Sequence, residues 1–259
     1  MKKTALITGA SSGIGLELAH IFASKGNNLV LVARSKEKLE VLKQELENKF
    51  GISVYNIVKD LSEISSSKSI FDEIQNQNIR IDYLVNNAGF GDFGVFAECN
   101  WDKQLEMIQL NVIALTYLTR LILPVMIKQK YGKILNVAST AAFQPGPTMS
   151  VYFATKAYVL SFSEAIANEL KGTGVTVTIL CPGATATGFK TAAALEDSNL
   201  FKGNQIASSK DVAEFGYKKM MNGKVVVIHG LINNILVQSV RFAPRNMVAA
   251  IAKLKLKSK

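Results

Sequence analysis

The sequence predicts an α/β fold, in which a doubly wound parallel sheet of about seven strands carries helices on both faces. Short runs rich in Val, Ile and Leu alternate with longer segments whose apolar residues recur every three or four positions. A glycine-rich turn joins the first run to the first helical segment. Since no repeat or Pro-rich linker divides the 259 residues, we expect a single domain, residues 1–259.

The predicted elements alternate along the chain. Strands are expected at residues 3–8, 28–33, 53–58, 81–86, 133–137, 175–181 and 224–228. Helices are expected at residues 16–24, 36–48, 66–77, 102–127, 152–170 and 210–221. Such alternation gives right-handed crossovers, so the carboxyl ends of the strands share one edge of the sheet. Ligands bind at that edge in Rossmann-like folds.

The composition excludes several classes of protein. Apolar residues make up 48% of the chain and charged residues 19%, which excludes a mainly disordered protein. The only cysteines and histidines are isolated, so we expect neither a disulfide framework nor a metal site; they are Cys99, Cys181, His20 and His229. The apolar run at the N-terminus is too short for a signal peptide, and a cytoplasmic location is expected. Residues 112–127 are too short to span a membrane and are interpreted as a buried helix.

Positive charge is concentrated at the C-terminus. Of the 30 basic and 20 acidic residues, nine basic and no acidic ones follow Glu214. Residues 229–259 are expected to form a basic extension of two helices that shields the substrate pocket or contacts a membrane surface. A carrier protein is another anionic partner that this charge fits, and a merely solvated terminus is the alternative. Nucleic-acid binding is not expected, because the charged region contains no recognition motif.

The turn after the first strand reads Thr8-Gly9-Ala10-Ser11-Ser12-Gly13-Ile14-Gly15. Glycines permit positive φ and the close approach of a pyrophosphate, and the N-terminus of the following helix offers free N–H groups. The spacing is G-x-x-x-G-x-G rather than the common G-x-G-x-x-G. We predict phosphate binding by Gly9, Ser11, Ser12, Gly13, Ile14 and Gly15, with a purely structural turn as the alternative.

The end of the second strand indicates the type of nucleotide. An acidic residue there would bind the ribose 2′-hydroxyl of NAD, whereas Arg suits the 2′-phosphate of NADP. This chain has Arg34, and its first acid comes only at Glu37. We therefore predict NADP(H), with NAD less favoured, and Lys38 as a second candidate for the phosphate. Asp60 and Leu61 follow the third strand and are expected beside the adenine.

Tyr152 and Lys156 form a Y-x-x-x-K pattern at the start of a predicted helix. At this spacing two side chains lie on one helix face about 6 Å apart. A neighbouring cation can lower the pKa of a phenol by ~1–3 units, which would make it a better proton donor and acceptor. Ser139, at the end of a strand, can orient the substrate oxygen. Asn111 can hold a kink in the long helix and a water linked to Lys156.

Together these residues resemble the short-chain dehydrogenases/reductases, over residues 3–224. The resemblance rests on the glycine turn, Asp60, Asn86 to Gly89, Asn111, Ser139, the Tyr152-x-x-x-Lys156 pattern and Pro182-Gly183. It implies a catalytic tetrad of Asn111, Ser139, Tyr152 and Lys156, with Tyr152 as general acid and Lys156 on the nicotinamide ribose. It also implies cofactor contacts from Asn87, Ala88, Gly89, Pro182, Gly183, Thr185 and Thr187. A homodimer or homotetramer built on the long helices is expected.

Aromatic and Met side chains are placed to line a substrate pocket, namely Phe93, Phe143, Met149 and Phe189. These phenylalanines can equally pack a lid or a dimer seam. Residues 188–205 are expected to close over the site.

The sequence thus predicts an NADP(H)-dependent oxidoreductase that moves a hydride between nicotinamide and a carbonyl or secondary alcohol of an apolar small molecule. The alternatives are a 3-oxoacyl reductase acting on carrier-protein or CoA thioesters, and a module that senses NADP(H) without turnover.

Overall fold

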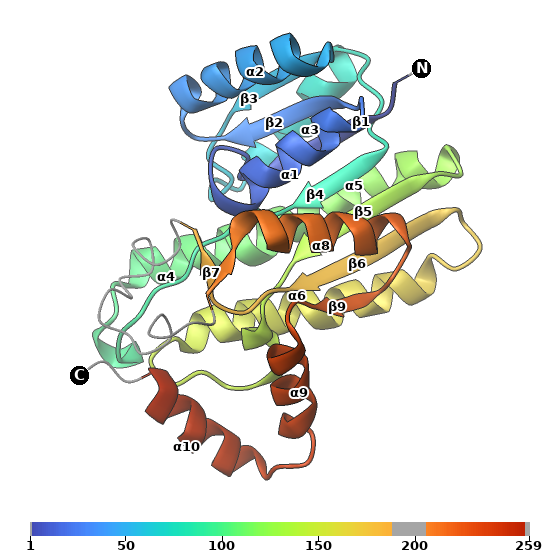
Figure 1. Ribbon diagram of the computed structural model, residues 1–259. Helices are drawn as coiled ribbons and strands as arrows, with labels where there is room; N and C mark the ends of the chain where they lie inside the picture. The colour runs from blue at the N-terminus through green and yellow to red at the C-terminus, as the bar shows by residue number, and fades with distance from the viewer. Residues whose placement is uncertain (1, 188–205, 257–259) are drawn as a thin grey trace.

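The computed structural model describes residues 2–187 and 206–256. Within these residues, seven strands form one parallel sheet in the order β3-β2-β1-β4-β5-β6-β9 (Figure 1). The strands are β1 (Thr4–Thr8), β2 (Asn28–Ala33), β3 (Val54–Val58), β4 (Tyr83–Asn86), β5 (Gly132–Val137), β6 (Val175–Cys181) and β9 (Val226–Ile228). Short strands β7 (Thr185–Ala186) and β8 (Ala207–Ser208) pair beside the main sheet. The predicted parallel-sheet fold is confirmed.

The helices connect these strands in chain order. They are α1 (Gly13–Ser24), α2 (Lys36–Phe50), α3 (Ser66–Asn76), α4 (Trp101–Ile108), α5 (Leu115–Lys128), α6 (Ser150–Glu169), α8 (Ser209–Met221), α9 (Leu231–Val240) and α10 (Arg245–Leu256). Short 3₁₀ turns form η1 (Phe96–Glu98) and η3 (Thr140–Phe143). The helix predicted at 102–127 is divided, because the π-helical segment η2 (Gln109–Ala114) lies between α4 and α5.

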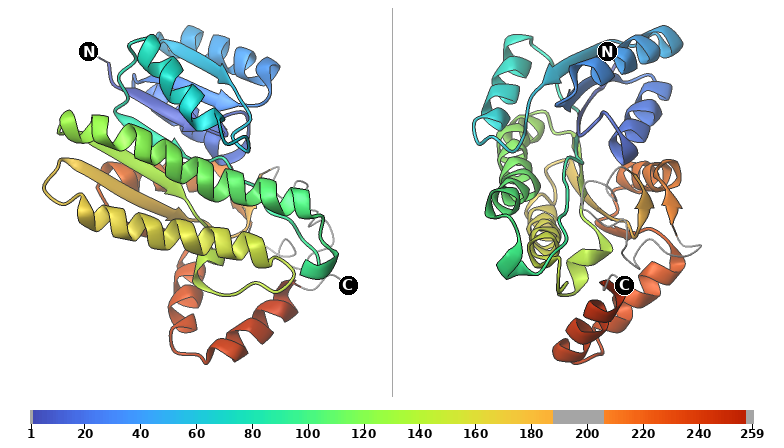
Figure 2. Two further views of the ribbon diagram at one scale, coloured as in Figure 1. Left: turned by 180° about the vertical axis from the view of Figure 1, so that it is seen from behind. Right: turned by 90° about the vertical axis from the view of Figure 1, so that its left-hand side faces the viewer.

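Alternation along the strands directs side chains to two separate helix layers. In β1, Ala5 and Ile7 pack with α1, α2 and α8 on one face, whereas Leu6 packs with α3, α5 and α6 on the other. Figure 2 shows the two layers from behind and from the side. Both faces of the central strands are therefore buried, as the continuous apolar runs predicted.

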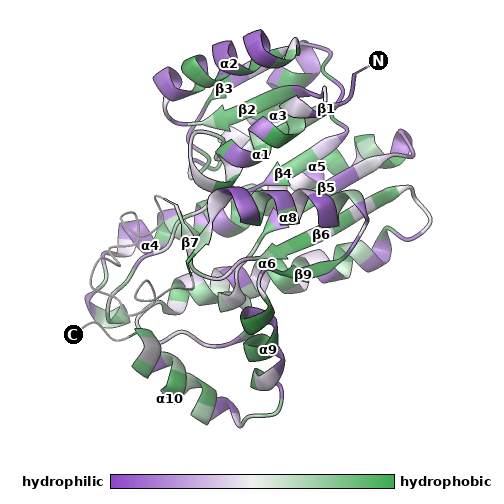
Figure 3. Ribbon diagram, in the orientation of Figure 1, coloured by the Kyte–Doolittle hydropathy of each residue, from purple (hydrophilic) through white to green (hydrophobic). Residues whose placement is uncertain are grey.

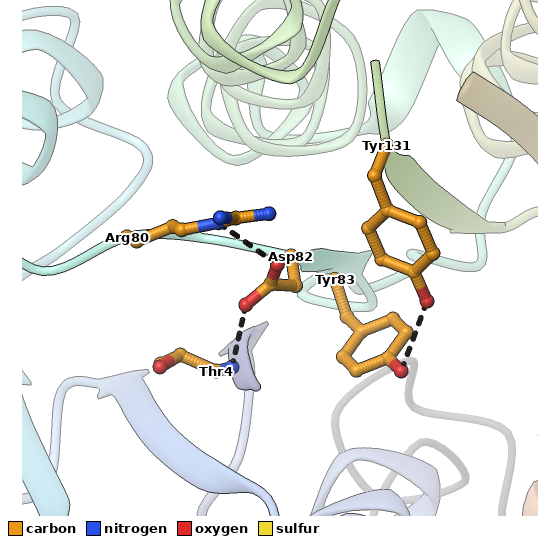
Figure 4. A network of polar contacts seen from close by, with 5 residues as sticks. All are labelled: Thr4, Arg80, Asp82, Tyr83 and Tyr131. Carbon is orange, nitrogen blue, oxygen red and sulfur yellow. Dashed lines mark hydrogen bonds and ion pairs between the residues drawn. The ribbon is translucent and has the colours of Figure 1, made fainter. Parts of the chain in front are cut away.

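Polar groups link the amino ends of the central strands (Figure 4). The Asp82 carboxylate accepts hydrogen bonds from the Thr4 backbone N–H at 3.0 Å and from Arg80 Nε at 3.1 Å. The Tyr131 and Tyr83 hydroxyls are 3.1 Å apart. We call Thr4, Arg80, Asp82, Tyr83 and Tyr131 the amino-edge clasp. Residues 81–82 were predicted as strand, but β4 begins at Tyr83, where Asp82 uses its side chain to bind the start of β1.

The run Trp101–Lys128 is long and apolar enough to cross a membrane by composition alone, and no other helix of the described residues meets that test. Its inner side chains Leu118, Ile122 and Met126 belong to the core under the sheet. We interpret it, as predicted for residues 112–127, as a helix that covers the sheet.

Candidate active site

A cavity of about 570 Å³ opens at the carboxyl edge of the sheet, where the strand order reverses between β1 and β4. This is the position at which open α/β sheets bind ligands. Most of the predicted site residues line it: Gly9, Ser11, Ser12, Gly13, Ile14, Arg34, Asp60, Leu61, Asn87, Ala88, Gly89, Ser139, Met149, Tyr152, Lys156, Pro182, Gly183, Thr185 and Thr187. Residues far apart in the sequence are thus brought to one place.

Gly15 and Asn111 do not line the cavity but support residues that do. A Cβ at Gly15 would collide with the Gly9 carbonyl oxygen and would stand 2.5 Å from Asn87 Nδ2. Asn87 Nδ2 also donates to the carbonyl oxygens of Thr8 at 3.0 Å and Gly9 at 3.2 Å. Gly15 is therefore a packing position, and the main role of the Asn87 side chain is to hold the glycine turn.

The glycine turn fits an anionic group. Gly9 and Gly13 have φ of +65° and +55°, a conformation that favours glycine. The Ser12 side chain at the N-terminus of α1 does not cap the helix, so the first N–H groups of α1 remain available to a phosphate. A dinucleotide pyrophosphate is suited to this position.

Cationic side chains gather at the end of the cavity beyond β2 and β3. Arg34, Lys38 and Lys59 all line it. Arg34 is 78% exposed and lies 3.5 Å from Asp60 Oδ2. Partial burial acts to raise the pKa of the Asp60 carboxyl, but hydrogen bonds from Ser62 and the charge of Arg34 outweigh it, and the pKa lies below its ordinary value. The exposed guanidinium and the two lysines can receive a further negative charge.

At the other end of the cavity lie Tyr152, Lys156 and Ser139. Burial raises the pKa of Tyr152 to about 12, although a hydrogen bond with Ser139 acts in the opposite direction. Burial also lowers the pKa of Lys156 to about 8, opposed by the nearby Cys181. Lys156 Nζ lies 5.8 Å from the centre of the Tyr152 ring and donates to the Val137 carbonyl oxygen at 2.9 Å.

The pKa of the Tyr152 phenol was expected to be lowered by Lys156. In the chain without nucleotide this pKa is raised instead, so that expectation is wrong. Lys156 directs a hydrogen bond to the Val137 carbonyl oxygen of β5, and the loss of hydration around the buried phenol raises its pKa. The proximity predicted from the helical spacing is correct, because both side chains line the same cavity from one face of α6.

Asn111, in the π-helical segment, links the loop after β4 to α6. Its side-chain oxygen accepts from the Phe90 N–H at 3.1 Å, and its Nδ2 donates to the Phe90 carbonyl oxygen at 2.9 Å. Nδ2 also lies 3.1 Å from Thr155 Oγ1, which donates to the Tyr152 carbonyl oxygen at 2.7 Å. A π-helical segment occupies the place of the predicted kink, and this single side chain links the loop after β4 to α6.

Sequence reasoning missed a second polar network, buried within the strands. Asn86 Nδ2 donates to Asn136 Oδ1 at 2.8 Å and to Thr119 Oγ1 at 3.0 Å, and Asn136 Nδ2 donates to Ser163 Oγ at 2.8 Å. The network fixes α6 to β4 and β5. Two Asn residues in otherwise apolar strands were the signal that could have revealed it.

The predicted substrate residues are divided by the structure. Met149 lines the cavity, but Phe93 and Phe143 do not; each packs against a neighbouring apolar cluster. Phe90 and Phe153 line it instead. Only tertiary packing decides which aromatic side chains face the cavity, and a contact of Phe93 or Phe143 with substrate stays a prediction. Phe189 and the segment 188–205 lie outside the described residues.

The C-terminal extension also reaches the end of the cavity that Met149, Tyr152 and Phe153 line, which we call the substrate end. Leu256, at the end of α10, packs in one cluster with Met149, Tyr152 and Phe153. The extension was predicted to shield the pocket or to contact a membrane surface, and no local signal in the sequence singled out Leu256. Among the described residues, no group of three or more His, Cys, Asp or Glu side chains could hold a metal ion.

A sequence profile of the short chain dehydrogenase family matches residues 3–197. The chain is a short-chain dehydrogenase/reductase. It is accordingly an oxidoreductase acting on alcohol or carbonyl groups, and its family binds a nicotinamide cofactor.

Similar proteins of known type agree with this family. The NADP-dependent 3-hydroxy acid dehydrogenase of Schizosaccharomyces pombe is 33% identical over 218 residues, which are 82% of this chain and 84% of that protein. The very-long-chain 3-oxoacyl-CoA reductase of Anas platyrhynchos is 34% identical over 190 residues; these are 71% of this chain but only 60% of that protein. A short-chain dehydrogenase from Sphingobium yanoikuyae, solved in complex with NADPH, has a TM-score of 0.83, 31% identity and 93% coverage of both chains.

Proposed function

We propose that this short-chain dehydrogenase/reductase uses NADP(H) to interconvert a carbonyl group and a secondary alcohol on an apolar small molecule, with Tyr152 as general acid and base. The observation that carries the proposal is the single cavity that joins a glycine turn and a cationic end to the Tyr152, Ser139 and Lys156 group. A protein that only senses the nucleotide has no need for a buried phenol beside a lysine.

The chain's own residues would hold the cofactor along this cavity. The N–H groups at the start of α1 would bind the pyrophosphate, and Arg34 and Lys38 the 2′-phosphate. Bound NADPH would supply the hydride for carbonyl reduction. Preference for NADP(H) over NAD(H) is supported by the three cations at the β2 and β3 end and by the NADPH complex of the relative from Sphingobium yanoikuyae.

In the reducing direction, the Tyr152 hydroxyl donates its proton to the substrate oxygen. A pKa of about 12 keeps that hydroxyl protonated at neutral pH, so the proton is present when the reaction needs it. Ser139 hydrogen-bonds Tyr152 and can orient the substrate oxygen toward it. The buried Lys156 ammonium stabilises the phenolate that remains after proton transfer. In the oxidising direction the same phenolate accepts the proton.

The experiment that tests this proposal is a titration with NADPH and NADH, followed by a panel of apolar ketones, aldehydes and 3-oxoacyl thioesters. Tighter NADPH binding and oxidation of NADPH by an apolar ketone support it. Nucleotide binding without turnover of any compound would favour a sensing module, and a lack of nucleotide binding would refute the cofactor assignment.

A second candidate is a 3-oxoacyl reductase. The similarity to the Anas platyrhynchos 3-oxoacyl-CoA reductase favours it, and so does the apolar wall formed by Phe90, Met149 and Phe153. Turnover of a 3-oxoacyl-CoA with a lower KM than that of simple ketones would select this candidate.

We also propose a homo-oligomer that packs the long helices together. Apolar side chains are exposed along them, namely Leu105, Ile113, Ile127 and Tyr158. Light scattering after size-exclusion chromatography measures the subunit count, and a monomer at micromolar concentration would refute this proposal.

A further inference from the structure

Apolar side chains are exposed on one face of α9. Leu231, Ile232, Ile235 and Leu236 are all exposed, with Leu231 at 75%. Their spacing of one, four and five residues places them on the same side of the helix. Phe242, in the turn that leads to α10, is 90% exposed. An exposed apolar surface of this kind indicates an interaction site.

Helix α10 carries two apolar stripes, and only one of them holds it to the body. Val248, Ala252 and Leu256 are buried at four-residue spacing. Met247, Ile251 and Leu254 also recur with helical spacing, but they are exposed. The outer stripe is therefore not needed to hold the helix in place. Figure 3 shows both helices as largely apolar, at the end of the molecule away from α2 and β3.

The charged residues of this part of the chain, after Glu214, are all basic. Arg241 and Arg245 flank the exposed Phe242, and Lys253 lies on α10. No Asp or Glu follows Glu214 in the sequence. A second copy that packed these helices against their own counterparts would bring basic residues together without acidic residues from the same helices to balance them. An anionic partner balances the charge, and an interfacial lipid layer also accepts Leu, Ile, Phe and Met side chains beside the charges.

The same two helices contact the substrate end of the cavity. Leu256 packs with Met149 and Tyr152, and α9 packs against η3, which follows Ser139. A Cβ at Gly183 would stand 2.5 Å from Asn233 Nδ2 at the start of α9. A surface that binds these helices would lie next to the Tyr152 end of the cavity.

We infer that α9 and α10, together with the turn between them, form a docking surface for an anionic lipid bilayer. We call residues 231–256 the C-terminal hairpin. Its exposed Leu, Ile, Phe and Met side chains enter the lipid interface, and its arginines pair with lipid phosphates. Docking brings the substrate end of the cavity to the membrane, a consequence that rests on the proposed function.

The test is flotation of the full chain with two kinds of vesicle, phosphatidylcholine alone and phosphatidylcholine mixed with phosphatidylglycerol. The chain is expected to float with the anionic vesicles and to release as salt is raised, because salt screens the arginines. Leu231→Ser/Ile235→Ser/Phe242→Ser should reduce the bound fraction about tenfold. These side chains point to solvent, so the fold should be retained, as circular dichroism will show.

Control variants remove exposed apolar and basic side chains elsewhere on the surface. Val41 and Ile64 are each 67% exposed, and Val41→Ser/Ile64→Ser should float as the unmodified chain does. Arg241→Gln/Arg245→Gln should weaken flotation, whereas Lys25→Gln/Lys49→Gln should not.

Three results would overturn the inference: no flotation of the unmodified chain with anionic vesicles, equal flotation of the hairpin variant, or self-association that depends on the hairpin and replaces vesicle binding. NADPH binding measured on the same samples separates this inference from the proposed function. Flotation without nucleotide binding refutes only the proposed function, and nucleotide binding without flotation refutes only the docking surface.

Discussion

Both edges of the sheet bury polar side chains, but only those at the carboxyl edge lie beside the cavity. At the amino edge, both oxygens of Asp82 accept hydrogen bonds and the Tyr83 and Tyr131 hydroxyls meet. At the carboxyl edge, Tyr152 and Lys156 are buried beside an open cavity. Burial raises the pKa of Tyr83 as well as that of Tyr152. A raised tyrosine pKa therefore does not distinguish the two edges, whereas the cavity beside Tyr152 and Lys156 does.

The largest effect is expected for Tyr152→Phe, compared with Tyr83→Phe as its control. Tyr152→Phe removes the proton donor and should lower kcat about 10³-fold, while the chain stays folded and still binds NADPH. Tyr83→Phe is the matched variant at the amino edge and should leave kcat unchanged. Steady-state rates with a ketone from the panel measure both. Equal losses in the two variants would remove the distinction between the edges.

Asp82→Ala tests the stabilising role of the amino edge. Loss of the carboxylate leaves the buried Thr4 N–H without its partner, which should lower the free energy of unfolding by about 2 kcal/mol. Urea unfolding measures this change. The Kd for NADPH should stay as it is, since the clasp lies at the opposite edge from the cavity. A change in nucleotide affinity larger than the change in stability would contradict the comparison.

Arg34→Ser, at the carboxyl edge, should change the preference of the chain for NADPH over NADH. Loss of a charge-assisted contact to the 2′-phosphate should raise the Kd for NADPH about tenfold and leave the Kd for NADH nearly unchanged. Arg80→Ser removes an arginine from the amino edge and should change neither. Fluorescence titration measures all four constants. Equal weakening of both nucleotides by Arg34→Ser would exclude a 2′-phosphate contact.

The smallest effect concerns the pH dependence of stability without nucleotide. Lys156 has a folded-state pKa of about 8 against an ordinary value of 10.5, so above pH 8 the unfolded chain binds more protons at this group. Stability should therefore rise with pH, by about 1 kcal/mol between pH 7 and 9. Lys156→Met should lack this increase. Urea unfolding of both proteins at the two pH values provides the comparison, and a parallel pH response would refute the assignment.

The sequence predicted the sheet well because its signals are local. β2 and β6 have the predicted bounds, since their apolar runs end at turn residues. The proximity of Tyr152 and Lys156 could be predicted for the same reason, because their four-residue spacing places them on one helix face. The division of the long helix at Gln109–Ala114 was accessible only in part, because Asn111 bonds to Phe90 and Thr155 across the fold.

The substrate wall could not be predicted from local signals. Phe93 and Phe143 differ from Phe90 and Phe153 in neither residue type nor pattern, and only packing against other helices separates them. Leu256 reaches Tyr152 through the path of α9 and α10. The pKa of Tyr152 depends on how completely surrounding side chains exclude water, which composition and spacing do not encode.

The bonds around the glycine turn also bear on the entropy of nucleotide binding. The Thr8 hydroxyl accepts from the N–H groups of Asn87 and Ala88 at 3.0 Å each, and the Asn87 amide holds the carbonyl oxygens of Thr8 and Gly9. The chain itself thus fixes the backbone that is proposed to bind the phosphates. The glycine turn is already ordered when the chain has folded. Its backbone therefore loses little further conformational entropy when a dinucleotide binds.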